Sequence, residues 1–187
     1  PAGDPTIAAK AFATFYRALR TAVSTPFWPA PLVDAATFSD KQMRESWLRL
    51  ATEKNPDWVK RYASRLEPLI DLIMSRLEQR PLVFMHAHLA GTDVRVNEAG
   101  EYIVFANHLW SFRQSGYDLS FPTWGQWLAR AKEERTSADI QHVTQAWEQE
   151  ISTSLSDLVS MSDWHLMLLN RIFGSILLDI PAIARMP

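Results

Sequence analysis

The middle of the chain, residues 81–121, interrupts a sequence whose periodicity is otherwise that of α-helices. Three short runs there, LVFMH, DVRV and EYIVFA, are rich in β-branched and aromatic residues, and the turn-forming stretch NEAG, ending in Gly100, separates the last two. This pattern predicts a lead-in strand followed by a β-hairpin. Long helical segments with so few strands between them predict a mainly α fold with a small β-hairpin, of the α+β class.

The N-terminal part, residues 1–80, is expected to consist of helices. Asp4 before Pro5 is a helix-start signal, and the apolar spacing that follows predicts an amphipathic helix to about Ser24. A second helical pattern covers 41–53.

Asn55 before Pro56 predicts another helix start. Pro68 lies inside the pattern that follows, and an interior proline costs about 3 kcal/mol because a backbone hydrogen bond is lost. We therefore expect a short helix to about Arg65 and a longer one from Glu67 to about Gln79.

The C-terminal part, residues 122–187, is also expected to be helical. The patterns predict helices over about 122–134 and 137–161, and a last helix after Ser162 and Asp163. This last segment is apolar over most of its circumference, so its helix should be central to the core.

Composition limits the classes of function. The 187 residues are predicted to form a single lobe, and with 47% hydrophobic and 21% charged residues the chain belongs with globular proteins. A formal net charge of −2 gives no electrostatic reason to expect nucleic acid or a membrane as partner. The sequence has no cysteine, no apolar run near the roughly 18 residues of a membrane span and no signal-peptide pattern. We expect a cytoplasmic protein.

The stretch HAHLAGTDVRVNEAGEYIVFANHLWSFRQSGYDLS resembles part of a known family. In the C-terminal lobe of the aminoglycoside phosphotransferase and choline kinase-like branch of the protein-kinase-like fold, a helix leads into a catalytic loop of the form H-G-D-L-x-x-x-N. A hairpin, an I-D-W/F motif and Y-D-L-A follow in that order. His86 and Leu89 take the places of the loop's histidine and leucine, and Tyr117 to Leu119 take those of Y-D-L. The resemblance covers 66–128 at motif level and implies a protein-kinase-like C-lobe whose N-lobe is absent from this chain.

The resemblance also implies that the catalytic positions are substituted. His88 stands where the family has its catalytic aspartate, and Asp93 where it has an asparagine that helps to hold magnesium. Ala106 replaces the metal-binding aspartate, with Asn107 beside it as a weak cofactor contact. Because phosphoryl transfer depends on Mg²⁺ to neutralise developing charge, this loss removes a large electrostatic contribution. His88 is suited to act as a base near neutral pH, but it cannot replace an anionic metal ligand.

Cofactor binding is not expected of this chain alone. The sequence has six glycines and shows neither a Gly-rich phosphate loop nor a strand-borne lysine. Mg-ATP binding is therefore expected only if a complete N-lobe exists.

The histidines also allow a metal site. If their segment were a strand, His86 and His88 would point to the same side, and with Asp93 and His108 they would offer ligands for a divalent transition metal. The alternative is that His86 is a buried, structural histidine bonded to backbone while His88 is partly exposed.

Two further assignments concern the residues after the hairpin. Asp118 is expected to be a structural anchor, because the family's Y-D-L aspartate sits at a helix start and accepts N–H bonds from the catalytic loop. Trp110, Arg113 and Tyr117 are candidates for a ligand or partner surface, and the alternative is that they pack the loop against neighbouring helices.

Three functions are consistent with these residues. The favoured one is a degenerate, pseudokinase-type lobe with a binding or scaffolding role, inactive alone and expected to be a fragment of a two-lobe protein that meets an N-lobe or a protein partner. The second is a divergent small-molecule phosphotransferase that needs a missing N-lobe and uses His88 and Asp93; its substrate is unknown. The third is a metal-binding enzyme that uses the HxH segment.

Overall fold

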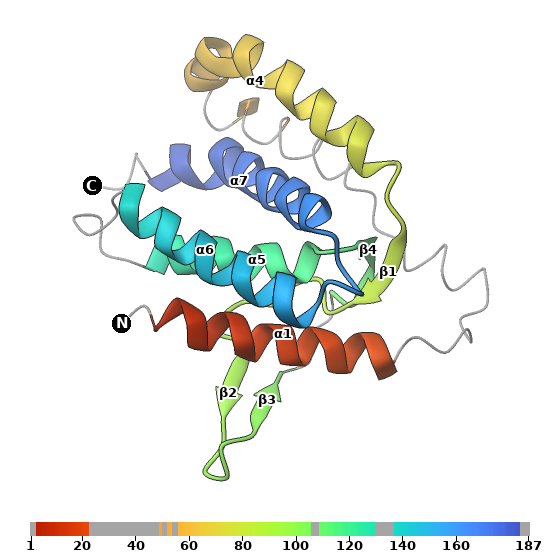
Figure 1. Ribbon diagram of the computed structural model, residues 1–187. Helices are drawn as coiled ribbons and strands as arrows, with labels where there is room; N and C mark the ends of the chain where they lie inside the picture. The colour runs from red at the N-terminus through yellow and green to blue at the C-terminus, as the bar shows by residue number, and fades with distance from the viewer. Residues whose placement is uncertain are drawn as a thin grey trace.

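The computed structural model describes residues 3–22, 49, 52–53, 56–105, 109–129 and 137–183. This part of the chain is mainly helical, with two small antiparallel sheets of two strands each. In Figure 1 the helices are stacked one above another, one sheet lies at the side of the stack beside the helix ends, and the other projects from the bottom of the stack as a hairpin. In chain order the elements are α1 (Pro5–Ala22), α4 (Pro56–Leu77), β1 (Leu82–Met85), β2 (Val94–Val96), β3 (Tyr102–Val104), β4 (Ser111–Gln114), α5 (Tyr117–Ala129), α6 (Ser137–Ser154) and α7 (Met161–Ile183).

The first helix begins where the sequence predicts. The Thr6 amide donates to Asp4 Oδ1 at 2.8 Å, which satisfies one of the free N–H groups of the first turn. α1 ends at Ala22, two residues before the expected end, and it packs against α5 and α6. Most of the helix expected over 41–53 lies outside the described residues.

The predicted break at Pro68 is wrong. α4 starts at Pro56 as expected and continues through Pro68 to Leu77. A proline inside a helix removes one backbone hydrogen bond, while the helical turns before and after it keep their hydrogen bonds. Ile73 and Leu77 are buried in the core, where α4 packs against α7, so tertiary contacts stabilise the helix beyond the proline.

α5 starts five residues before the expected position at Pro122. The chain turns into the helix at Gly116, which has a φ of 87°, and the Leu119 and Ser120 amides both donate to its carbonyl at 3.2 Å. The sequence prediction relied on the proline as a start signal, whereas this glycine turn starts the helix.

The boundary between the last two helices also differs from the prediction. α6 ends at Ser154 and does not continue to Met161, and the Arg17 guanidinium donates to the carbonyl of Ser154. α7 begins at Met161, and the Ser160 hydroxyl accepts the Asp163 amide at 3.1 Å. Ser160 is therefore the cap that the prediction placed at Ser162 and Asp163.

Strand β4 was not predicted. It pairs antiparallel with the expected lead-in strand β1, with Phe84 opposite Phe112 and Met85 opposite Ser111. All four residues of β4 are buried. A strand that is half-buried is recognised by alternating polar and apolar residues. Because both faces of β4 are covered, its sequence, SFRQ, shows no such alternation.

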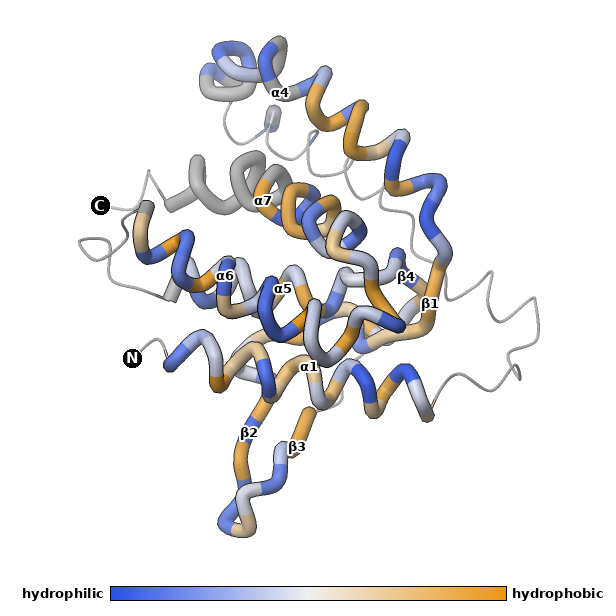
Figure 2. Tube along the Cα trace, in the orientation of Figure 1, coloured by the Kyte–Doolittle hydropathy of each residue, from blue (hydrophilic) through white to orange (hydrophobic). Residues whose placement is uncertain are grey.

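The β-hairpin does form as predicted, with Val94 paired to Val104 and Val96 to Tyr102. At its turn the Gly100 amide donates to the Asn97 carbonyl at 3.0 Å, and Gly100 has a φ of 80°. Apart from Arg95, the residues of β2 and β3 are aliphatic or aromatic, although the hairpin projects from the body of the molecule (Figure 2).

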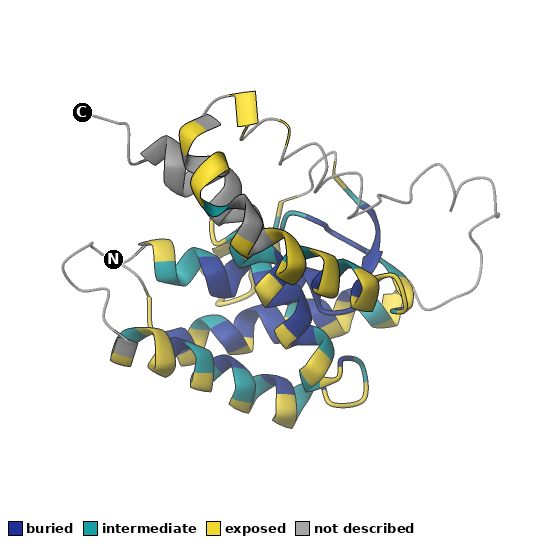
Figure 3. Ribbon diagram, turned by 90° about the horizontal axis from the view of Figure 1, so that it is seen from above, coloured by how far each residue is buried: buried dark blue, intermediate teal, exposed yellow. Residues whose placement is uncertain are grey.

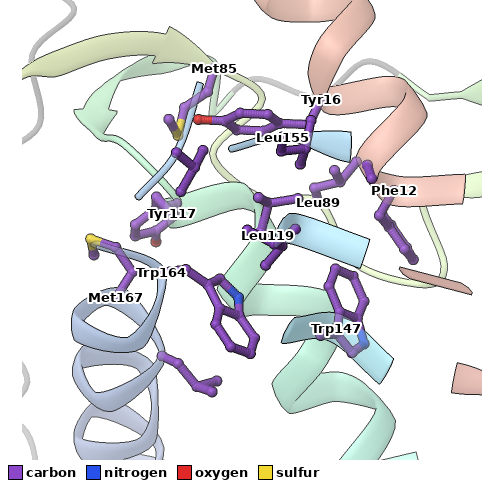
Figure 4. Close-up of a cluster of buried hydrophobic side chains, with 14 of the residues drawn as sticks. Phe12, Tyr16, Met85, Leu89, Tyr117, Leu119, Trp147, Leu155, Trp164 and Met167 are labelled. Atoms are coloured by element: carbon purple, nitrogen blue, oxygen red, sulfur yellow. The ribbon is translucent and has the colours of Figure 1, made fainter. Parts of the chain in front are cut away.

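The core lies where the stacked helices face one another, and the outer helix faces are exposed (Figure 3). Trp147 of α6 and Trp164 of α7 are fully buried, and Tyr16, Leu89 and Leu119 lie in the same cluster (Figure 4). In the first half of α7, Trp164, Leu166, Met167 and Leu168 are buried, whereas Ser162, His165 and Leu169 are exposed, so one face of this helix contributes to the core. No helix in the described part of the chain combines the length and apolar character needed to span a membrane.

Candidate functional site

The loop after β1 is joined to the start of α5 by one buried carboxylate. The His86 amide donates to Asp118 Oδ2 at 2.9 Å, and the Ala87 amide donates to Oδ1 at 2.8 Å. Asp118 is the second residue of α5 and is 0% exposed. Ala87 has a φ of 64°, in the left-handed region that a residue with a side chain rarely adopts. Both oxygens of Asp118 are thus used to hold a strained loop.

Burial strongly perturbs this carboxyl group. Loss of solvation raises the pKa of Asp118 from 3.8 to about 7. The two backbone hydrogen bonds and the positive charge of Arg113 act in the opposite direction and lower this pKa. Desolvation outweighs these contacts because a charged group in the interior loses the water that stabilises it. The protonation state of Asp118 therefore changes near neutral pH.

Arg113 and Tyr117 are 5% and 7% exposed, so they offer almost no surface to a partner. The Arg113 guanidinium lies over the Tyr117 ring, 4.8 Å from its centroid, and Nε donates to the Ser111 hydroxyl at 3.2 Å. Trp110 is half-buried, and its ring lies 5.6 Å from that of Phe84. The packing alternative describes the positions of Arg113 and Tyr117, while Trp110 remains partly exposed.

His86 is buried at the centre of this region. Its Nε2 lies 2.8 Å from the Phe105 carbonyl, which only accepts, so Nε2 carries the proton and donates. The rings of Phe15 and Trp110 meet the imidazole edge-on, at centroid distances of 6.2 and 5.1 Å. This hydrogen bond joins the loop to the chain that leaves the hairpin.

His88 faces a different environment and forms a pair with Asp93. Its Nδ1 lies 3.3 Å from Asp93 Oδ2, which also accepts the Ala90 amide at 2.8 Å. The His88 side chain is 42% exposed and that of Asp93 is 20% exposed. A carboxylate beside Nδ1 favours the tautomer in which Nδ1 carries the proton and Nε2 is free to accept one. This arrangement is suited to proton transfer.

Of the expected metal ligands, the structure brings His88 and Asp93 together and places His86 in a different, buried environment. β1 ends at Met85, and the left-handed conformation of Ala87 removes the strand alternation that would put both histidines on one side. His86 is therefore fully buried while His88 is half-exposed. Across the ranges that the structure covers, no three histidine, aspartate or glutamate side chains are grouped to hold a metal ion. His108, Asn107 and Ala106 lie outside those ranges.

Two contacts of the site were not predicted from the sequence. The Gly116 amide donates to the Tyr16 hydroxyl at 3.4 Å, and burial raises the pKa of this fully buried tyrosine. The His88 ring lies 4.7 Å from that of Phe121, and the Arg171 guanidinium lies 4.1 Å from the same Phe121 ring. The spacing of apolar residues that predicts the first helix does not indicate a partner for the Tyr16 hydroxyl, and no local pattern relates Phe121 to His88.

These contacts define a mainly helical protein in which a buried carboxylate anchors a loop that carries a histidine and aspartate pair. Comparison with known proteins adds no family to this description: neither a family model, nor a curated protein, nor a solved structure matches the chain.

Proposed function

We propose that this chain is a degenerate, protein-kinase-like C-lobe with a binding or scaffolding role. The observation that carries the proposal is the double hydrogen bond from the His86 and Ala87 amides to Asp118. It has the form that the kinase-like resemblance implies for the aspartate of Y-D-L. The order of strand, loop, hairpin and helix supports the same reading.

The residues that would perform phosphoryl transfer are changed while the loop framework is retained. His88 occupies the position of the catalytic aspartate, and Ala106 that of the principal metal carboxylate. A methyl group offers Mg²⁺ no ligand, and an imidazole is a poor ligand for a hard cation that prefers oxygen. A loop framework kept without its principal metal carboxylate supports recognition of a partner in preference to catalysis.

A second candidate is a divergent phosphotransferase that gains its nucleotide contacts from an N-lobe. The 3.3 Å contact between His88 Nδ1 and Asp93 favours it, because the carboxylate orients the ring and leaves Nε2 as a base at a half-exposed position. In this candidate His88 would accept the proton of a substrate hydroxyl.

The test is thermal denaturation of the chain with millimolar Mg-ATP. A ligand that binds only the folded state, at a hundred times its Kd, stabilises it by about 2.7 kcal/mol, which raises the Tm measurably. The binding-domain proposal predicts no change in Tm relative to magnesium alone. A clear rise that is lost in His88→Ala would overturn the proposal and favour the phosphotransferase.

A further inference from the structure

A cavity of about 480 Å³ lies between the start of α1, the loop at 90–94 and α5. Its size falls within the range of roughly 300–1,000 Å³ that is typical of small-molecule sites. Three segments distant in the sequence form its walls, and these include Ala8 and Phe12, then Thr92 and Val94, then Pro122. The cavity therefore exists only in the folded chain.

The lining of the cavity determines what it can accept. Its walls are mostly aliphatic and aromatic, and no lysine, arginine, aspartate or glutamate is among the described residues that line it. A charged ligand would lose its hydration there without gaining an opposite charge. The cost of removing a neutral and largely apolar molecule from water is much smaller.

Gln126 supplies one directional polar group. Trp147 Nε1 donates to Gln126 Oε1 at 2.8 Å, and because an indole nitrogen only donates, this contact identifies the amide oxygen. The Gln126 NH₂ group is then the part that can donate to a ligand in the cavity, which Gln126 lines. A carbonyl or ether oxygen on the ligand would suit this donor.

Two of the three glycines that line the cavity, Gly91 and Gly125, stand at positions where the backbone conformation does not require glycine. Gly125 lies inside α5, where glycine destabilises a helix, and Gly91 lies in the loop. A Cβ atom at either position would meet no heavy atom within 4 Å in the part of the chain that the structure describes. Neither has the positive φ that Gly100 and Gly116 have. The space in front of them is therefore open.

We propose that this cavity binds a neutral, largely apolar small molecule with one hydrogen-bond acceptor, and that Gly91 and Gly125 keep the cavity open for it. His88 does not line the cavity, and the proposal does not require the kinase-like reading. It also goes beyond a scaffolding role, because it assigns a ligand class to the chain.

The test uses 6-propionyl-2-(dimethylamino)naphthalene, a neutral and largely apolar dye whose ketone oxygen is a hydrogen-bond acceptor and whose emission shifts to shorter wavelength when it leaves water. We expect saturable binding to the parent chain, and at least tenfold weaker binding to Gly125→Leu, whose side chain would occupy the cavity. Gln145→Leu adds the same side chain at an exposed position of α6 and should bind the dye like the parent. Circular dichroism checks that each variant is folded.

Gly91→Val is a second test of the same cavity, because it narrows the cavity from the loop and leaves helix α5 unchanged. This variant should also bind the dye more weakly than the parent chain. The proposal is overturned if the parent shows no saturable binding, or if both glycine variants bind the dye as the parent does. It is equally overturned if Gln145→Leu loses binding to the same extent, or if Ile103→Ser on the exposed hairpin abolishes it, since the dye would then bind elsewhere.

Discussion

Replacing Asp118 by alanine should destabilise the fold far more than replacing His88. The two amides that Asp118 accepts, from His86 and Ala87, are held in a buried part of the loop. Each unsatisfied buried group costs about 1–3 kcal/mol, so their loss amounts to roughly 2–6 kcal/mol. An exposed helix cap costs only about 1 kcal/mol.

The loss of stability caused by Asp118→Ala depends on pH, and the direction of this dependence follows from the raised pKa of Asp118. The pKa of Asp118 is about 7 in the folded chain and near its ordinary 3.8 when unfolded, so between these values the folded state holds the extra proton. The contribution of Asp118 to stability is complete below about pH 4 and is lost as pH rises towards 7, at about 1.4 kcal/mol per pH unit. The loss caused by Asp118→Ala should therefore be larger at about pH 5 than at about pH 7.

Urea denaturation at about pH 5 and about pH 7 measures both effects, with His88→Ala as the matched control. His88 has one long contact with Asp93 and a half-exposed ring, so its removal should cost less than about 1 kcal/mol. Equal stability of the parent and Asp118→Ala at about pH 5 would refute the anchor. A larger loss in His88→Ala would show that the anchor is assigned to the wrong residue.

Three other perturbations test neighbouring features. Gly116→Ala should cost about 1–3 kcal/mol in urea denaturation, because its φ of 87° is strained for alanine and the new Cβ would lie 3.3 Å from the Trp164 backbone; unchanged stability would contradict this. Tyr16→Phe removes the hydroxyl that accepts the Gly116 amide and should lower the free energy of unfolding by about 1 kcal/mol, whereas a more stable variant would show that the contact is unimportant. Zinc and nickel should bind weakly at most in titration calorimetry, since His88 and Asp93 have no third ligand grouped with them in the described ranges; submicromolar, one-to-one binding that disappears in His88→Ala would reverse this expectation.

Part of the candidate site could be predicted from the sequence, because the pairing of His88 with Asp93 is a contact across five residues. The bonds of Asp118 to His86 and Ala87 cross 32 and 31 residues, and only the resemblance to a family suggested them. No pattern in the sequence indicated the cavity, because its walls come from three separate segments.

The sequence by itself determined the features that depend on neighbouring residues. Asp4 satisfies an amide two residues away, and the turn between Asn97 and Gly100 closes the hairpin through its own hydrogen bond. Such interactions are nearly the same in any environment, so residue types and spacing are enough to predict them.

Only the tertiary structure decided the features that depend on distant partners. The helix continues through Pro68 because α7 covers the turns beyond it, and β4 is a strand because β1 supplies its hydrogen bonds. His86 is buried and His88 half-exposed because the backbone reverses at Ala87, where Asp118 holds it. In each case packing and hydrogen bonds from a remote segment outweigh the local preference of the chain.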